Sequence, residues 1–129
     1  WVIENLLRNA MDAMPHGGRI ALTLRYSENR AQIDCADTGC GIPKRKWRSV
    51  FRPGYSTKTR GWGLGLSLAR RIVKEYHKGK IFVLESSPQR GTTFRILLPY
   101  TCNDEIAKFV DFGRYGANGF GNLCVMFQR

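Results

Sequence analysis

The sequence predicts an α+β fold, a two-layer α/β sandwich in which helices cover one face of a mixed, mostly antiparallel sheet. Residues 1–14 and 64–77 carry apolar side chains at the period of amphipathic helices. Four other stretches alternate apolar and polar residues as half-buried strands do, and they form two pairs separated by short turns: 19–26 with 31–37, and 80–87 with 91–100. At 129 residues the chain is long enough for one core and too short for two.

The first helix is expected to end at Pro15, which cannot continue the hydrogen-bond ladder and is followed by a glycine turn. A short helix with Pro43 in its first turn is expected over 43–51, and a loop follows it. The second long helix is expected to point five side chains into the core: Leu66, Ala69, Ile72, Val73 and Tyr76.

Residues 101–129 show no helical or strand period, and we expect them to form an irregular tail, possibly non-native, after a domain spanning 1–100. The chain opens on Trp1, so we expect a partner domain upstream of it. It has no apolar run of the roughly 18 residues that a membrane span needs. The four cysteines lack the spacing of a zinc site, which favours reduced thiols in a cytoplasmic domain.

The formal net charge of +11 indicates a surface that attracts anions, with the densest cluster in PKRKWR, residues 43–48. Nucleic acid, an acidic protein surface and a polyphosphate ligand all fit this charge, and so does a cationic face that only contacts solvent. Charge alone therefore does not choose the partner.

A glycine run precedes the second long helix. Gly61, Gly63 and Gly65 leave backbone N–H groups uncovered beside the positive end of the helix dipole, an arrangement that suits a phosphate group. The spacing matches neither the dinucleotide motif nor the P-loop, so a glycine-rich hinge loop is the alternative.

Asp37 ends a predicted strand and is followed by Gly39 and Gly41. A carboxylate held there can accept a hydrogen bond from an exocyclic amine such as that of adenine, and the glycines allow a flat ring to approach the backbone. The alternative is a tight turn in which Asp37 accepts local N–H groups.

The first helix carries Asn5 and Asn9 four residues apart, hence on one face, with Glu4 and Asp12 nearby. Amide oxygens at the rim of a pocket suit Mg²⁺, which prefers hard oxygen ligands and shares its coordination shell with substrate phosphates. Capping of neighbouring loops by the two amides is the alternative.

Five blocks in one order carry a resemblance to a known family: ENLLRNAMDAM (4–14), DTGCGIP (37–43), VFRPGYSTK (50–58), GWGLGLSLARRIV (61–73) and GTTFRILLP (91–99). Together they resemble the ATP-binding catalytic domain of sensor histidine kinases, of the short-lid, nitrogen-regulator-like type. This family belongs to the wider group of gyrase, the large heat-shock chaperones and mismatch-repair ATPases. The strand that usually precedes the first block is missing, so the resemblance implies an N-terminally truncated domain over 1–100.

The resemblance implies a Bergerat-type sandwich, ATP and Mg²⁺ as cofactors, and transfer of the γ-phosphoryl group to a histidine. Asn9 resembles the principal Mg²⁺ ligand, and Asn5, one turn earlier, a residue that touches metal or phosphate. Lys58 resembles a phosphate contact. These three are the implied catalytic residues, and Asn5 and Asn9 form the implied metal set. Phe51 is implied to pack the lid shut. The implied nucleotide-binding set is Asn9, Asp12, Asp37, Gly39, Gly41, Ile42, Lys58, Gly61, Gly63, Leu64, Gly65 and Thr92.

Neither His16 nor His77 lies in the acidic-flanked helix that the family phosphorylates, so the implied acceptor is on an absent dimerisation domain of the same kinase. The receiver domain of a response regulator is the next implied partner, and no specific nucleic acid is expected. Glu4 lies one residue off the metal-facing side of the helix, so we expect slow hydrolysis. Membrane anchoring of the parent protein stays open.

Two other functions remain in play. One is a basic module that binds nucleic acid or an acidic partner through Lys44, Arg45 and Lys46. The other is a catalytically inactive adaptor on the same fold, which binds ATP and never transfers its phosphate.

Overall fold

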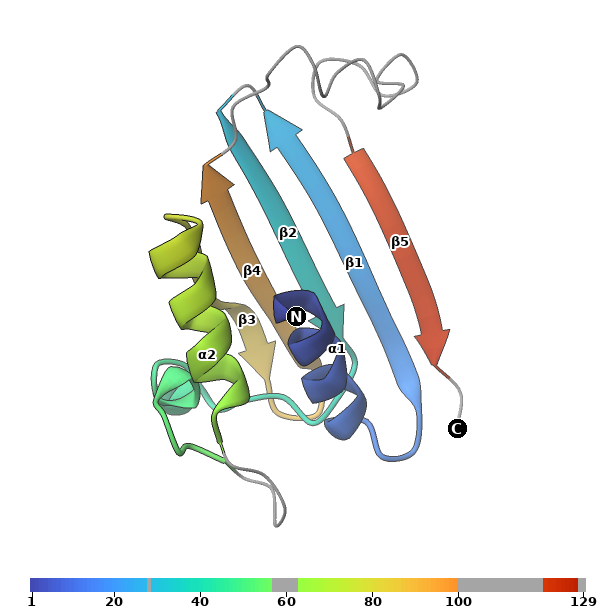
Figure 1. The fold of residues 1–129 in the computed structure, drawn as a ribbon. Helices are drawn as coiled ribbons and strands as arrows, with labels where there is room; N and C mark the ends of the chain where they lie inside the picture. The colour runs from blue at the N-terminus through green and yellow to red at the C-terminus, as the bar shows by residue number, and fades with distance from the viewer. Residues whose placement is uncertain (28, 57–62, 100–119, 128–129) are drawn as a thin grey trace.

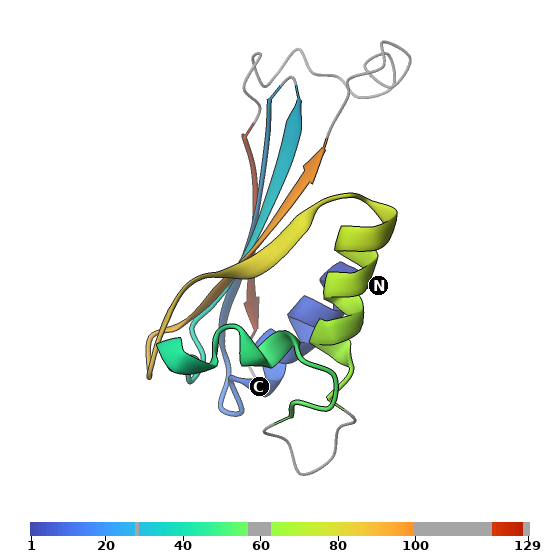
Figure 2. The ribbon, with the colours of Figure 1, turned by 90° about the vertical axis from the view of Figure 1, so that its left-hand side faces the viewer.

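The computed structural model describes residues 1–27, 29–56, 63–99 and 120–127, and it forms two layers. All helices of these residues lie on one face of a five-stranded sheet with the order β3-β4-β2-β1-β5 (Figures 1 and 2). The helical elements are α1 (Val2–Asp12), η1 (Lys44–Lys46), η2 (Ser49–Phe51), α2 (Gly65–Arg71) and η3 (Ile72–Tyr76). The strands are β1 (Gly18–Ser27), β2 (Arg30–Asp37), β3 (Lys80–Ser87), β4 (Gly91–Pro99) and β5 (Phe120–Phe127).

The two predicted hairpins are confirmed: β1 pairs with β2, and β3 with β4. They join through an antiparallel β2–β4 ladder in which Cys35 lies opposite Phe94. Every strand pair among the described residues is antiparallel, so the expectation of a mixed sheet is corrected. Short turns explain the two hairpins, because a strand that returns after a few residues can only pair antiparallel with its predecessor.

The predicted stripe of α1 forms one side of the core. Leu6, Ala10 and Met14 are almost fully buried against the sheet, as a helical period requires. The sheet contributes the alternate residues that face the helices, among them Ile20, Cys35, Val83, Phe94 and Ile96. The core therefore lies between the two layers, and α1 is fixed at the end of the sheet where β2 ends.

The second long helix, formed by α2 and η3, buries Ala69 and Val73 as predicted. The prediction that Tyr76 points into the core is wrong, because 74% of Tyr76 is exposed. The cause is a change of helix type, since η3 is a π-helix in which the His77 N–H donates to the Ile72 carbonyl at 3.3 Å. The wider turn of a π-helix shifts each later residue around the axis, so Tyr76 leaves the buried face.

The short helix predicted over 43–51 is instead two 3₁₀ turns, η1 and η2. The indole N–H of Trp47 donates to the Ile42 carbonyl at 2.9 Å and holds the first turn. The second turn inserts Phe51 into the core, edge-on to the ring of Phe94 with centroids 6.0 Å apart. Phe51 is thus a core residue; residues 57–62 lie outside the described residues, so packing of Phe51 against the expected lid stays a prediction.

The described part of the tail, which was expected to be irregular, is a strand, β5. β5 pairs antiparallel with β1, from Gly18 opposite Phe127 to Arg25 opposite Phe120. The pairing satisfies N–H and C=O groups that β1 would otherwise leave at the sheet edge. Residues 100–119 lie outside the described part, and the domain boundary at 100 stays a prediction. No helix among the described residues has the length and apolarity to cross a membrane.

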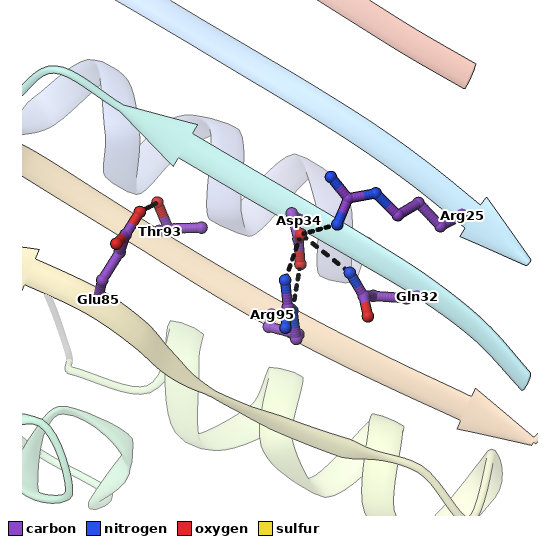
Figure 3. A network of polar contacts seen from close by, with 6 residues as sticks. All are labelled: Arg25, Gln32, Asp34, Glu85, Thr93 and Arg95. Atoms are coloured by element: carbon purple, nitrogen blue, oxygen red, sulfur yellow. Dashed lines mark hydrogen bonds and ion pairs between the residues drawn. The ribbon is translucent and has the colours of Figure 1, made fainter. Parts of the chain in front are cut away.

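A polar network lies on the sheet face that points away from the helices (Figure 3). Asp34, next to the core residue Cys35 and so on the opposite face, accepts two hydrogen bonds from Arg95, at 2.7 and 2.8 Å. Gln32 donates to the same carboxylate at 3.1 Å, and Arg25 lies 3.9 Å from it. The network ties β1, β2 and β4 together without reaching the helical side.

Candidate functional site

A pocket of about 710 Å³ lies where α1, the loop after β2, the start of α2 and the start of β4 meet. Its volume is in the range of small-molecule and cofactor sites. Ten residues proposed from sequence line it: Asn5, Asn9, Asp12, Asp37, Gly41, Ile42, Gly63, Leu64, Gly65 and Thr92. The sequence blocks that carry them, far apart along the chain, thus share one cavity. Lys58 and Gly61 lie outside the described residues, and Gly39 does not line the pocket.

Asp37 is the buried carboxylate of this pocket, with 9% of the residue exposed. Its Oδ1 accepts the N–H of Gly39 at 2.8 Å and the N–H of Thr92 at 3.2 Å. Burial raises the pKa of Asp37 above its ordinary value, and the two backbone hydrogen bonds oppose that rise. The Gly39 bond is the local turn contact considered above. The Thr92 bond goes further, because it fixes the carboxylate to the neighbouring strand.

The loop after Asp37 is pressed between α1 and β3. The Cys40 N–H donates to the Ala13 carbonyl at 3.1 Å, and a Cβ on Gly39 would lie 2.7 Å from that same oxygen. Gly41 has φ +76°, and a Cβ there would collide with the Ser87 carbonyl. Both glycines are thus required by close backbone approach. Gly39 serves loop packing and Gly41 also borders the pocket.

The two asparagines of α1 lie side by side on the pocket face. The Nδ2 of Asn9 donates to the Oδ1 of Asn5 at 3.3 Å, and both residues are half-buried. A Cβ on Gly65 would collide with the Asn5 amide, so glycine lets α2 begin against this pair. The hydrogen bond between the two amides joins residues four positions apart and so runs along the helix face.

The segment before α2 is anchored to the loop after η2. The Gly54 N–H donates to the Gly63 carbonyl at 3.0 Å, and Gly63 has φ +63°. Tyr55 and Ser56 on one side of this contact and Leu64 on the other line the pocket. Residues 54–56 and 63–64 therefore lie together at the pocket wall.

Twelve lining residues were not among the candidates from sequence: Trp1, Glu4, Arg8, Ala13, Cys40, Pro43, Lys46, Val50, Tyr55, Ser56, Leu66 and Phe94. The helical period of α1 could have indicated Arg8, which lies three residues after Asn5. Glu4, predicted one residue off the Asn5–Asn9 face, borders the pocket as well. Arg8 pairs with Glu4 at 2.9 Å, and both side chains are well exposed at the pocket rim.

An α/β sandwich with a pocket of this size, a buried carboxylate at a strand end and an amide pair on the covering helix fits a small-molecule or cofactor site, in which a few polar groups orient the ligand. The model of the family described as histidine kinase-, DNA gyrase B- and HSP90-like ATPase matches residues 1–101. The chain belongs to this family.

Curated relatives point to the histidine kinase branch. The chain is 38% identical to sporulation kinase C of Bacillus subtilis (strain 168) over 98 residues, which are 76% of this chain and 22% of that protein. It is 40% identical over 99 residues to the signal transduction histidine-protein kinase AtoS of Escherichia coli (strain K12), covering 76% of this chain and 16% of that one. The chain therefore spans less than a quarter of these relatives.

Solved structures agree. The catalytic domain of histidine kinase ThkA is 33% identical with a TM-score of 0.66, over 78% of this chain and 64% of that one. The mycobacterial sensor histidine kinase MprB is 30% identical with a TM-score of 0.68, over 79% and 70%. The chain is thus an ATPase domain of the histidine kinase type, and these findings do not favour a basic nucleic-acid module or an adaptor.

Proposed function

We propose that this chain binds ATP together with Mg²⁺ and donates the γ-phosphoryl group to a histidine on a separate dimerisation domain of the same kinase. The observation that carries the proposal is the meeting of Asp37, the Asn5–Asn9 pair and Gly63–Gly65 around one pocket of about 710 Å³. Family membership supports the ATP part, and the pocket supplies a residue for each part of the ligand.

Asp37 is the proposed partner of the adenine amine. Its Oδ1 is occupied by two backbone N–H groups, and Oδ2 makes no hydrogen bond within the part of the chain that the structure describes. An ionised carboxylate only accepts hydrogen bonds, so the remaining oxygen fits a ligand that donates. Gly41, Ile42 and Thr92 border the same end of the pocket and would surround the ring.

Asn9, with Asn5 beside it, is the proposed Mg²⁺ site. The donor set fits the ion, because amide oxygens are hard ligands and Asp12 borders the same wall. No group of three His, Cys, Asp or Glu side chains that could hold a metal occurs among the described residues. We propose that Asn9 and Asn5 would hold Mg²⁺ together with the oxygens of a bound triphosphate. The bound ion would neutralise phosphate charge.

Phosphoryl transfer needs positioning and charge neutralisation more than covalent chemistry. We propose that the backbone of Gly61, Gly63, Leu64 and Gly65 and the Lys58 ammonium orient the triphosphate. His16 and His77 are exposed and do not line the pocket, which supports an acceptor histidine on another domain. The receiver domain of a response regulator would take the phosphoryl group next. We place the domain in the cytoplasm, where ATP is available and the free thiols of Cys35 and Cys40 stay reduced.

Phosphohistidine formation tests the transfer step. The 129-residue chain is mixed with the dimerisation domain of a related kinase and with ATP labelled at the γ-phosphate. We expect label on the dimerisation domain, lost when Asn9 is replaced by alanine and kept in the control Asn29→Ala, which changes an exposed turn residue outside the pocket. ATP binding without label transfer to several such domains would instead indicate a domain that only senses the nucleotide.

A further inference from the structure

A serine behind the pocket wall joins three segments of the site. Ser86 on β3 is half-buried and does not line the pocket. Its Oγ accepts the backbone N–H of Ile42 at 2.7 Å, and it lies 2.9 Å from the Gly91 carbonyl and 2.8 Å from the Thr92 hydroxyl. Ile42 and Thr92 both line the pocket, so one hydroxyl fixes two parts of its wall relative to each other.

A β-bulge turns this side chain toward the pocket. Val83, which is buried in the core, lies opposite Phe94, and the register then shifts so that Glu85 lies opposite Thr93 and Ser86 opposite Thr92. Without the shift, strand alternation would place Glu85 on the side of Val83. The extra residue instead places Ser86 there, and bulges commonly re-aim a side chain in this way.

The three contacts fix the direction of the hydroxyl protons. A carbonyl only accepts, so the contact with Gly91 is a hydrogen bond only if Ser86 donates its single proton to it. Thr92 must then donate its own proton to Ser86, whose two lone pairs are filled by Thr92 and by the Ile42 N–H. In this arrangement all three contacts are hydrogen bonds, and the Thr92 hydroxyl has no proton left for the pocket.

This direction bears on Asp37. The backbone N–H of Thr92 holds Oδ1 of Asp37 at 3.2 Å, so Ser86 fixes both the strand position and the hydroxyl of the residue that orients this carboxylate. A Thr92 hydroxyl released from Ser86 would be free to donate to the ligand side of the pocket. There it would compete with any ligand amine for acceptors.

We propose that Ser86 is a positioning residue that lets the Asp37 end of the pocket recognise the 6-amino group of a purine. It does so by holding Ile42 and Thr92 in place and by keeping the Thr92 proton out of the pocket. The inference rests on the proposed function, because it requires the adenine ring at Asp37.

The test compares ATP with purine riboside triphosphate, which lacks only the 6-amino group. Both affinities are measured by calorimetry on the full chain and on Ser86→Ala. We expect the wild type to prefer ATP by about 10- to 100-fold, the effect of one hydrogen bond to a charged acceptor. In Ser86→Ala this ratio should fall by about 5- to 10-fold. If Ser86 had only a structural role, Ser86→Ala would weaken the binding of both nucleotides equally and leave the ratio of their affinities unchanged. Comparing two ligands on two variants forms a double-mutant-type cycle that separates the two cases.

Ser87→Ala is the matched control. Ser87 is the next residue on β3, and its hydroxyl makes no hydrogen bond to the described residues. The ratio of ATP to purine riboside triphosphate affinity in this variant should equal that of the wild type. Ser86→Thr keeps the hydroxyl and should retain the preference. Ser86→Cys, with a weakly hydrogen-bonding thiol, should lose it and serves if the alanine variant does not fold. An unchanged ratio in folded Ser86→Ala or Ser86→Cys, with ATP still bound, overturns the inference and leaves the proposed function intact. Failure of the wild type to bind ATP overturns both.

Discussion

The backbone N–H of Thr92 donates to the Oδ1 of Asp37 at 3.2 Å, although the two residues are 55 positions apart in sequence. This hydrogen bond joins the second residue of β4 to the last residue of β2, at the wall of the pocket. Gly91 precedes Thr92, and a Cβ on it would collide with the Asp37 carbonyl. The close approach of β4 to the end of β2 therefore depends on glycine at this position. The carboxylate is thus held in place before any ligand binds, which lowers the ordering cost of recognition.

Replacing Asp37 by asparagine is expected to separate stability from binding. Burial raises the pKa of the folded carboxyl, so the folded state favours the protonated form. Protonation of Asp37 therefore stabilises the fold. This stabilisation is fully present below the pKa of the carboxyl in the unfolded chain, about 3.8, and is lost as the pH rises through its higher pKa in the folded protein. Asparagine keeps an oxygen for the two N–H groups and carries no charge. Asp37→Asn should therefore raise the melting temperature at pH 7 and weaken ATP binding about 10-fold or more.

Thermal melts of wild type and Asp37→Asn between pH 3 and pH 8 check the stability part. The difference in melting temperature should shrink as the pH falls toward the unfolded pKa. A variant less stable than wild type at neutral pH would show that the charged carboxylate stabilises the fold, contrary to this account.

Asn9→Ala is expected to remove the dependence of nucleotide binding on Mg²⁺. The wild type should bind a non-hydrolysable ATP analogue more tightly with Mg²⁺ than with EDTA, because the amide oxygen would complete the shell of the phosphate-bound ion. Equal affinities under both conditions are expected for Asn9→Ala. Asn29→Ala should behave as wild type, and persistence of the full Mg²⁺ effect in Asn9→Ala would count against this residue as a ligand.

Gly65→Ala is expected to push α2 away from α1, because the new Cβ would overlap the Asn5 amide. Overpacking of this kind costs roughly 1–3 kcal/mol, measured by chemical unfolding, and ATP binding should weaken with it. The double variant Asn5→Ala/Gly65→Ala removes the overlapping group. It should recover stability without recovering ATP affinity, whereas no recovery of stability would mean that the Asn5 contact is not the cause.

Arg95→Met is expected to affect stability alone. It leaves the carboxylate of Asp34, on a residue only 8% exposed, without its two-pronged partner, at a cost of roughly 1–3 kcal/mol in the free energy of unfolding. The network lies on the sheet face away from the helices (Figure 3), whereas helical residues line the pocket, so ATP affinity should stay within twofold of the wild type. A large loss of affinity at unchanged stability would connect the open sheet face to the site.

Local periodicity was sufficient to predict most of the fold. The spacing of Leu6 and Ala10 placed α1 on the core, and strand alternation placed both hairpins. It was insufficient where hydrogen bonding departs from the regular pattern. The π-helix that exposes Tyr76 adds one residue to a helical turn, and the bulge that turns Ser86 inward adds one residue to a strand. Residue propensities do not predict either insertion.

The site shows the same division. The blocks containing Asn9, Asp37 and Gly65 could be predicted to share a cavity because each has a residue type suited to one part of a nucleotide. The role of Gly39 in packing against Ala13 could not, since it depends on a contact between segments distant in sequence. β5 was missed because Phe120–Phe127 lacks a clean alternation of apolar and polar residues, so no local signal marked it as a partner of β1.

Calorimetric titration of the chain with a non-hydrolysable ATP analogue, with and without Mg²⁺, tests the central claim most directly. The account predicts one site with a Kd between about 1 µM and 1 mM, tightened by Mg²⁺ and lost in Asp37→Ala. Absence of binding by a folded chain, or binding indifferent to both Mg²⁺ and Asp37→Ala, would contradict it.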